Sequence, residues 1–126
     1  MDKPLEGIRV IAIEQFGAGP YGSMYLAELG ADVIKVENRA TGGDPSRQSG
    51  AVTLADDDSA YFQAFNLSKR SVTVNLKSTE GRAIFEDLVR TADVVWNNLR
   101  GSQPAKLGLD YDTLKSIKSD IICTHI

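Results

Sequence analysis

Three glycines follow an apolar stretch near the start of this sequence, and their spacing is one that binds phosphate groups in many proteins. They lie in the segment Gly17-Ala18-Gly19-Pro20-Tyr21-Gly22, which matches G-x-G-x-x-G. Glu37 follows about twenty positions after the first glycine, where a dinucleotide site needs a carboxylate for a ribose hydroxyl. By motif alone, this pattern indicates a strand–helix–strand unit that binds NAD or FAD.

Pro20 argues against a dinucleotide as the ligand. In a dinucleotide site the helix opens on the pyrophosphate, and its free N–H groups point at the anion. A proline in the first turn keeps the helical geometry but removes one of those donors. Two interpretations of the glycines are therefore favoured over NAD: a tight strand-to-helix turn with close backbone packing, or backbone approach to an acyl or phosphate group.

The elements that would position these residues alternate along the chain. We expect strands at 8–13, 32–36, 71–76, 93–97 and 121–125, with helices at 20–29, 60–66, 78–91 and 111–118. The polar segments 38–59 and 98–108 are expected to be loops. This alternation predicts a Rossmann-like α/β fold with a mostly parallel sheet, right-handed crossovers and flanking helices.

The composition is that of an ordinary soluble domain. The 126 residues are 42% hydrophobic and 25% charged, which is enough to bury a core. The net charge of −3 argues against a general affinity for nucleic acid or for membranes. The single cysteine, Cys123, excludes an internal disulfide and fits a reducing compartment, so we expect a structural thiol in a cytoplasmic protein.

Polar residues follow the expected strands at their carboxyl ends, the edge where ligands bind in open parallel sheets. These ends carry residues 14–18, 37–39, 75–77 and 97–100, and the last loop adds Lys106. Such an edge suits a polyanionic, nucleotide-like ligand whose adenine rests on apolar side chains. Ordinary solvated loop charges are the alternative interpretation of each residue.

A series of short motifs runs in order through nearly the whole chain. They are PLEGIRV (4–10), AGP (18–20), LGADVIKVE (29–37), GD (43–44) with Arg47, NLSKRS (66–71), LK (76–77), EGR (80–82), ADVV (92–95), NLR (98–100) and LGL (107–109) with Tyr111. Together they resemble the opening of the class III CoA-transferases. This family contains formyl-CoA transferase, carnitine CoA-transferase and α-methylacyl-CoA racemase.

The resemblance implies a Rossmann-like large domain that binds CoA rather than NAD, in a homodimer of interlinked rings. Carried over by position, the CoA contacts are Gly17, Ala18, Asn38, Arg39, Val74, Asn75, Leu76, Lys77, Asn98, Leu99, Arg100 and Lys106. CoA bears about four negative charges, so the arginines and lysines among them are the expected phosphate partners. The N–H groups of Gly17 and Ala18 are expected at the thioester, and Asn98 is expected to offer its amide to adenine or pantetheine.

The family transfers CoA between carboxylic acids through an aspartate that carries covalent intermediates, and the resemblance places that aspartate beyond Ile126. We therefore expect residues 1–126 to be the CoA-binding N-terminal part of a large domain, without a catalytic residue, a metal or NAD of its own. Its substrates would be an acyl-CoA and a carboxylic acid. Two alternatives stay open: 2-methylacyl-CoA racemisation, and an inactive truncated chain that binds CoA. The apolar last strand predicts an open edge and self-association of this chain.

Two positions depart from formyl-CoA transferase. Gly17 stands where that enzyme has a glutamine that shields the intermediate, so specificity for formate or oxalate is not expected. Asn38 stands where it has an arginine, so a phosphate contact there would depend on Arg39.

Overall fold

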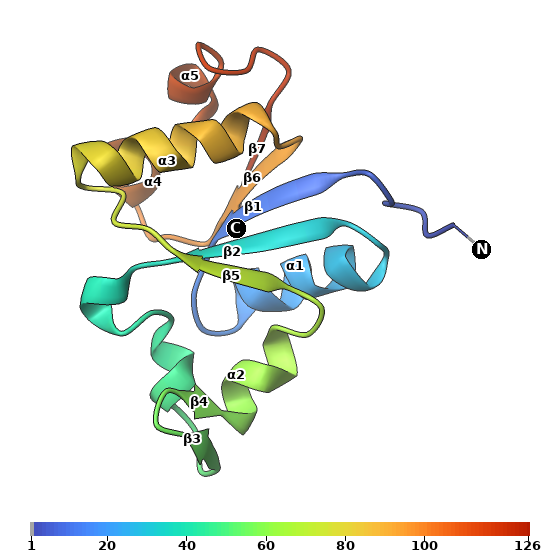
Figure 1. Ribbon diagram of the computed structural model, residues 1–126, viewed down its shortest axis with the longest axis vertical. Helices are drawn as coiled ribbons and strands as arrows, with labels where there is room; N and C mark the ends of the chain where they lie inside the picture. Colours follow the sequence, from blue (N-terminus) through green and yellow to red (C-terminus); the bar gives the residue numbers. More distant parts are fainter. Residues whose placement is uncertain (1) are drawn as a thin grey trace.

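The computed structural model describes residues 2–126 and has a five-stranded sheet at its centre (Figure 1). The strands are β1 (Arg9–Ile13), β2 (Asp32–Glu37), β5 (Arg70–Thr73), β6 (Val94–Asn97) and β7 (Ile122–His125). Their order across the sheet is β5-β2-β1-β6-β7, and each neighbouring pair is parallel. The predicted α/β fold with a parallel sheet is confirmed.

Helices cover both faces of the sheet because the central strands are apolar on both sides. On one face, Phe85 and Val89 of α3 (Thr79–Arg90) pack in one core with Ile11 of β1. On the other face, Ala27 of α1 (Ala18–Glu28) packs with Val10 and other small side chains. Figure 1 shows α1 and α3 on opposite sides of the sheet.

Residues at the helix ends explain where α3 begins and where α1 stops. The Ser78 hydroxyl caps α3 by accepting the Gly81 N–H at 3.0 Å. Gly30 has φ +107° just after the end of α1, a conformation that favours glycine. The helix α1 begins at Ala18, before the predicted start, and Pro20 is tolerated because it lies in the first turn. Ile84 of α3 is apolar but 51% exposed.

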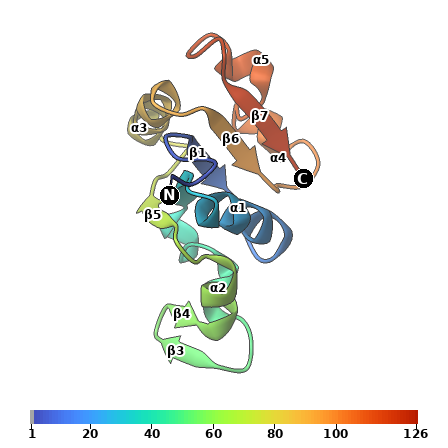
Figure 2. The same cartoon turned by 90° about the vertical axis from the view of Figure 1, so that its right-hand side faces the viewer.

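The two expected loops contain short elements that the sequence did not indicate. Segment 38–59 forms two 3-10 turns, η1 (Arg39–Thr41) and η2 (Pro45–Gln48), and a hairpin of β3 (Thr53–Ala55) and β4 (Asp58–Ser59). The second loop contains α4 (Gln103–Lys106). The helices α2 (Ala60–Phe65) and α5 (Tyr111–Leu114) lie toward opposite ends of the molecule, with the hairpin beside α2 (Figure 2). Both β5 and α5 end earlier than predicted.

The order of the strands reverses between β1 and β6. From β1 the chain moves outward to β2 and β5 on one side, then returns to β6 and β7 on the other side. The loops that follow β1 and β6 therefore leave the sheet in opposite directions. This reversal of strand order is the place where open α/β sheets bind ligands.

Candidate functional site

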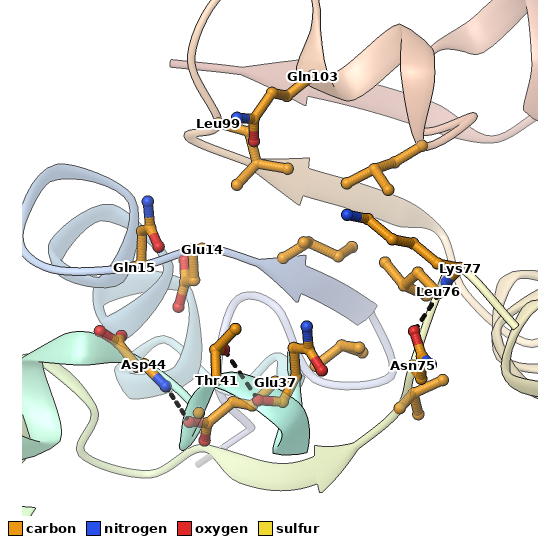
Figure 3. A pocket seen from close by; sticks show the side chains of 16 residues that line it. Glu14, Gln15, Glu37, Thr41, Asp44, Asn75, Leu76, Lys77, Leu99 and Gln103 are labelled. Atoms are coloured by element: carbon orange, nitrogen blue, oxygen red, sulfur yellow. Dashed lines mark hydrogen bonds between the residues drawn. The ribbon is translucent and has the colours of Figure 1, made fainter.

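Two adjoining pockets lie at the carboxyl edge of the sheet. The first, here called the edge pocket, has a volume of about 260 Å³ and is lined by Ile13, Glu14, Gln15, Val36, Glu37, Asn38, Thr41, Gly43, Asp44, Val74, Asn75, Leu76, Lys77, Leu99, Gln103 and Leu107 (Figure 3). The second, the switch-point pocket, has about 340 Å³ and is lined by Gln15, Phe16, Gly17, Ala18, Asn98, Arg100 and Gln103. Gln15 and Gln103 line both, so the two pockets are neighbours with a shared wall.

The structure brings ten of the twelve residues expected at CoA into these two linings. The edge pocket holds Asn38, Val74, Asn75, Leu76, Lys77 and Leu99, and the switch-point pocket holds Gly17, Ala18, Asn98 and Arg100. Figure 3 shows Leu76 and Lys77 across the edge pocket from Gln15. Each pocket thus keeps one basic residue in its lining, Lys77 or Arg100, and both are exposed.

Arg39 and Lys106 are the two expected residues that line neither pocket. Arg39 is exposed at the start of η1, and Lys106 is exposed at the end of α4. The neighbouring Asn38 lines the edge pocket, but its side-chain oxygen accepts the Ala40 N–H at 3.0 Å. Asn38 therefore caps η1 as well as facing the pocket.

Two of the motif glycines make room for residues of β6 and the loop behind it. A Cβ atom on Gly19 would lie 2.6 Å from Cγ of Asn98, and one on Gly22 would lie 2.7 Å from Cζ2 of Trp96. The Trp96 indole N–H also donates to the Gly19 carbonyl at 3.1 Å. The close backbone packing in one of the two interpretations is therefore confirmed at these two positions, which lie inside α1 rather than in the turn before it.

Glu37 is engaged inside the protein rather than free for a ribose. Arg47 donates to its two carboxylate oxygens at 2.6 and 2.9 Å, and the Asp44 N–H and the Ser71 hydroxyl donate at 2.8 and 2.7 Å. Burial raises the pKa of Glu37, but these hydrogen bonds and the Arg47 charge outweigh it and lower the pKa to about 2. Four donors on one buried carboxylate argue further against NAD.

This low pKa predicts a stability change in acid. The pKa of Glu37 is about 2 in the folded protein and 4.5 as the reference value. The Glu37 carboxylate therefore makes its full contribution to the free energy of unfolding above about pH 4.5. We expect the free energy of unfolding to fall as the pH drops from about 4.5 to about 2. Urea denaturation across this range, on the wild type and on Glu37→Gln, isolates the effect. Equal slopes with pH in the two proteins would contradict it.

A cluster of four buried charges lies beside the edge pocket, and sequence reasoning missed it. This buried ion cluster consists of Glu14, Lys35, Asp44 and Lys69, whose side chains are at most 2% exposed. The Lys35 ammonium lies 2.8 Å from Asp44 Oδ2 and 3.6 Å from Glu14 Oε1. Lys69 completes the cluster at 2.8 Å from Glu14 Oε1. The one available signal was a lysine in the middle of the apolar run of β2.

The buried ion cluster fixes the start of α1 against β1. The Ser23 hydroxyl donates to Glu14 at 2.8 Å, and Lys69 donates to the Pro20 carbonyl at 2.8 Å. Burial lowers the pKa of Lys69 to about 8, although the negative charge of Glu14 acts in the opposite direction. Two carboxylates are thus balanced by two lysines, and the third acid of the edge pocket, Glu37, pairs with Arg47. The acids of this pocket therefore do not oppose an anionic ligand.

The environment of Cys123 does not activate its thiol. Cys123 and His125 line a third cavity of about 210 Å³, together with Asp110. Burial raises the pKa of the Cys123 thiol, and the Asp110 charge adds to this, which is the reverse of activation. Among residues 2–126, no group of three or more His, Cys, Asp or Glu side chains is arranged to hold a metal ion. None of the helices described is long and apolar enough to cross a membrane.

A family model and named relatives match this chain in sequence. A family model described as CoA-transferase family III matches residues 5–126. The succinate–glutarate CoA-transferase of Agrobacterium fabrum is 47% identical, covering 98% of this chain and 32% of that protein. The succinyl-CoA:mesaconate CoA-transferase of Haloarcula marismortui is 40% identical, in a match that covers 97% of this chain and 31% of that protein.

A solved structure agrees with these sequence matches. The crystal structure of a CAIB/BAIF family protein from Brucella suis aligns with a TM-score of 0.87 and 38% identity, covering 99% of this chain and 33% of that one. This chain therefore spans about a third of the length of these relatives. The match of fold, motifs and sequence is continuous from residue 5 to the last residue. The chain belongs to CoA-transferase family III.

Proposed function

We propose that this chain is the CoA-binding N-terminal part of an enzyme that moves CoA between carboxylic acids. In this proposal residues 1–126 form the first part of its large domain, and the complete protein is a homodimer. The observation that carries it is the convergence of ten expected CoA positions on two adjoining pockets at the switch point of the sheet. Membership of the family and the transferase names of the two relatives support the same activity.

The chemistry of the two pockets suits the two ends of an acyl-CoA. The edge pocket offers apolar side chains with Lys77 at its rim, which suits adenine and a phosphate. In the switch-point pocket, the N-cap residue of α1 is Gly17, which offers no side chain to cap the helix, so first-turn N–H groups there need other partners. In this proposal those N–H groups, together with Arg100 of the same pocket, stabilise negative charge that develops on a thioester oxygen.

Several aspartates of this chain already have structural partners. Asp44 belongs to the buried ion cluster, Asp93 accepts the Arg9 N–H at 2.8 Å, and Asp110 caps α5 by accepting the Thr113 N–H at 3.0 Å. We therefore propose that the nucleophilic aspartate of the complete protein lies in the region that corresponds to the unmatched part of the relatives. We also propose that residues 1–126 alone do not catalyse CoA transfer.

The test of this function is CoA exchange by the complete protein that contains this chain. We expect labelled carboxylic acids, with succinate and glutarate among them, to enter the acyl-CoA pool. Deuterium incorporation at the α-carbon without CoA exchange would instead establish racemisation, which the transferase relatives do not favour. Calorimetric titration of residues 1–126 with CoA tests the binding step separately. Failure of both exchange and binding would overturn the proposal.

Arg100 offers a direct test of the binding site. If its guanidinium meets a phosphate or a carbonyl of CoA, Arg100→Ala should weaken CoA binding by about 1–3 kcal/mol in calorimetric titration. Arg90→Ala is the matched control, because Arg90 is an exposed arginine paired with Asp87 on α3. We expect its affinity for CoA to equal that of the wild type. An unchanged affinity of Arg100→Ala would remove this residue from the site.

A further inference from the structure

The side chain of Asn98 is bound to the protein's own backbone at the place where a CoA contact was expected. Its Oδ1 accepts the Gln15 N–H at 2.9 Å, and its Nδ2 donates to the Gln15 carbonyl at 2.9 Å. The oxygen and the nitrogen of the Asn98 amide thus bind the backbone N–H and the backbone carbonyl of Gln15, which lies 83 positions earlier in the chain. This paired geometry fixes the orientation of the Gln15 backbone, because neither bond forms if it rotates.

Asp44 holds the next residue of the same loop from another part of the fold. Its Oδ1 accepts the Phe16 N–H at 3.1 Å and the Ser46 N–H at 2.9 Å, while Oδ2 faces Lys35 at 2.8 Å. Phe16 has φ +61°, a left-handed conformation that is unfavourable for a bulky residue and persists only where its surroundings hold it. Asn98 and Asp44 together supply the contacts that hold it.

The loop fixed in this way, residues 15–17, separates the two pockets and leads into the first turn of α1. Gln15 lines both pockets, and Phe16 and Gly17 line the switch-point pocket. The absence of a side chain on Gly19 provides the space that Asn98 occupies. A shift of this loop would therefore move the N–H groups of Gly17 and Ala18 relative to a bound thioester.

We propose that Asn98 is a positioning residue rather than a CoA ligand, and that with Asp44 it sets the backbone of residues 15–17 for the acyl end of the substrate. This inference rests on the proposed CoA-binding function. It assigns Asn98 an effect on the thioester end of the ligand and none on the adenine end. A direct ligand of adenine would show the opposite pattern.

The experiment compares Asn98→Ala with the wild type, using two probes and a readout that needs no ligand. Succinyl-CoA carries the thioester, and adenosine 3′,5′-bisphosphate carries the adenine end alone. We expect Asn98→Ala to lose about tenfold in affinity for succinyl-CoA and to keep its affinity for the bisphosphate within about twofold. Hydrogen exchange of the Gln15 and Phe16 amides should become faster in the variant. The Gln15 N–H loses its acceptor on Asn98, and the loosened loop weakens the hydrogen bond from the Phe16 N–H to Asp44.

A matched control separates positioning from general destabilisation. Val89→Ala removes fully buried volume under α3 and lowers stability without touching either pocket. Its affinities and its exchange at Gln15 and Phe16 should stay at wild-type values at the same temperature. If Asn98→Ala binds both probes like the wild type, or loses both equally, the positioning role is wrong.

Gly19→Ala keeps the test decisive if Asn98→Ala does not fold. The added methyl group would displace the Asn98 side chain, although Gly19 itself lines neither pocket and no lining residue is replaced. We expect the same loss for succinyl-CoA and the same faster exchange at Gln15. Wild-type behaviour of this variant would overturn the inference. If the wild type itself binds neither probe, the proposed function fails, while the exchange rates still decide whether Asn98 holds the loop.

Discussion

Lys35→Met is expected to lower the free energy of unfolding by about 3–5 kcal/mol. The Lys35 side chain is 1% exposed and lies between the carboxylates of Asp44 and Glu14. Methionine fills a similar volume but carries no charge, so Asp44 would remain buried without a cation. Lys69 stays beside Glu14, which confines the damage to the Asp44 end of the buried ion cluster.

Chemical denaturation of residues 1–126 at neutral pH measures this loss. Arg70→Met is the matched control, because Arg70 pairs with Asp32 at the surface, where an ion pair contributes under about 1 kcal/mol. Adding Asp44→Asn to Lys35→Met removes the unpaired charge and should recover part of the stability. A loss for Lys35→Met no larger than that for Arg70→Met would show that the buried ion cluster does not stabilise the fold.

Gly81→Ala is expected to destabilise the protein by about 2 kcal/mol or more, although alanine is the better helix former. Gly81 lies in the first turn of α3, and a Cβ atom there would overlap the backbone carbonyl oxygen of Asn75. Backbone atoms cannot move aside as the end of a flexible side chain can. The substitution would push the segment after β5 away from α3, and that segment lines the edge pocket.

The sign of the change makes this prediction easy to check by thermal or urea unfolding. Ala83→Gly provides the comparison, since Ala83 is exposed in the same helix and should show only the ordinary propensity loss of about 1 kcal/mol. We also expect weaker CoA binding by Gly81→Ala, because Asn75, Leu76 and Lys77 would shift. A variant more stable than the wild type would refute the close approach of α3 to Asn75.

Four strands of the sheet were predictable because they lie in largely apolar runs, and β5 was predictable because apolar and polar residues alternate from 71 to 76. The hairpin of β3 and β4 was not, since Thr53, Leu54 and Ala55 are all exposed and show no buried face. It is held in part by Ser59, whose hydroxyl donates to the Ser46 carbonyl at 2.6 Å, a contact between two short elements. The spacing of apolar residues indicates which side of an element is buried, so an element that is exposed on all sides has no such pattern in its sequence.

The location of the site was predictable from the rule for parallel sheets, but the roles within it were not. The sequence gives the charge of a basic loop residue but not whether its side chain lines a pocket. Arg39 and Lys106, which line neither pocket, therefore could not be distinguished from Lys77 and Arg100, which do. The partner of Lys35 comes from the turn at Asp44, far outside the strand pattern. The two hydrogen bonds of Asn98 join it to Gln15 after β1, and Asn98 fits there because Gly19 of α1 leaves space for it. Both conditions depend on the three-dimensional fold and not on the local sequence.

The central place of β1 in the sheet has a consequence for synthesis of the chain. Its neighbour β2 follows 23 residues later, whereas the contact between Arg9 and Asp93 beside β6 spans 84 residues. At ~5–20 residues per second on the ribosome, β1 waits roughly 4–17 s with one edge open. During this interval a nascent chain exposes the strand that later forms the middle of its core. We therefore expect synonymous codons that change the rate of translation before Val94 to change the yield of native protein, which expression of recoded genes would measure.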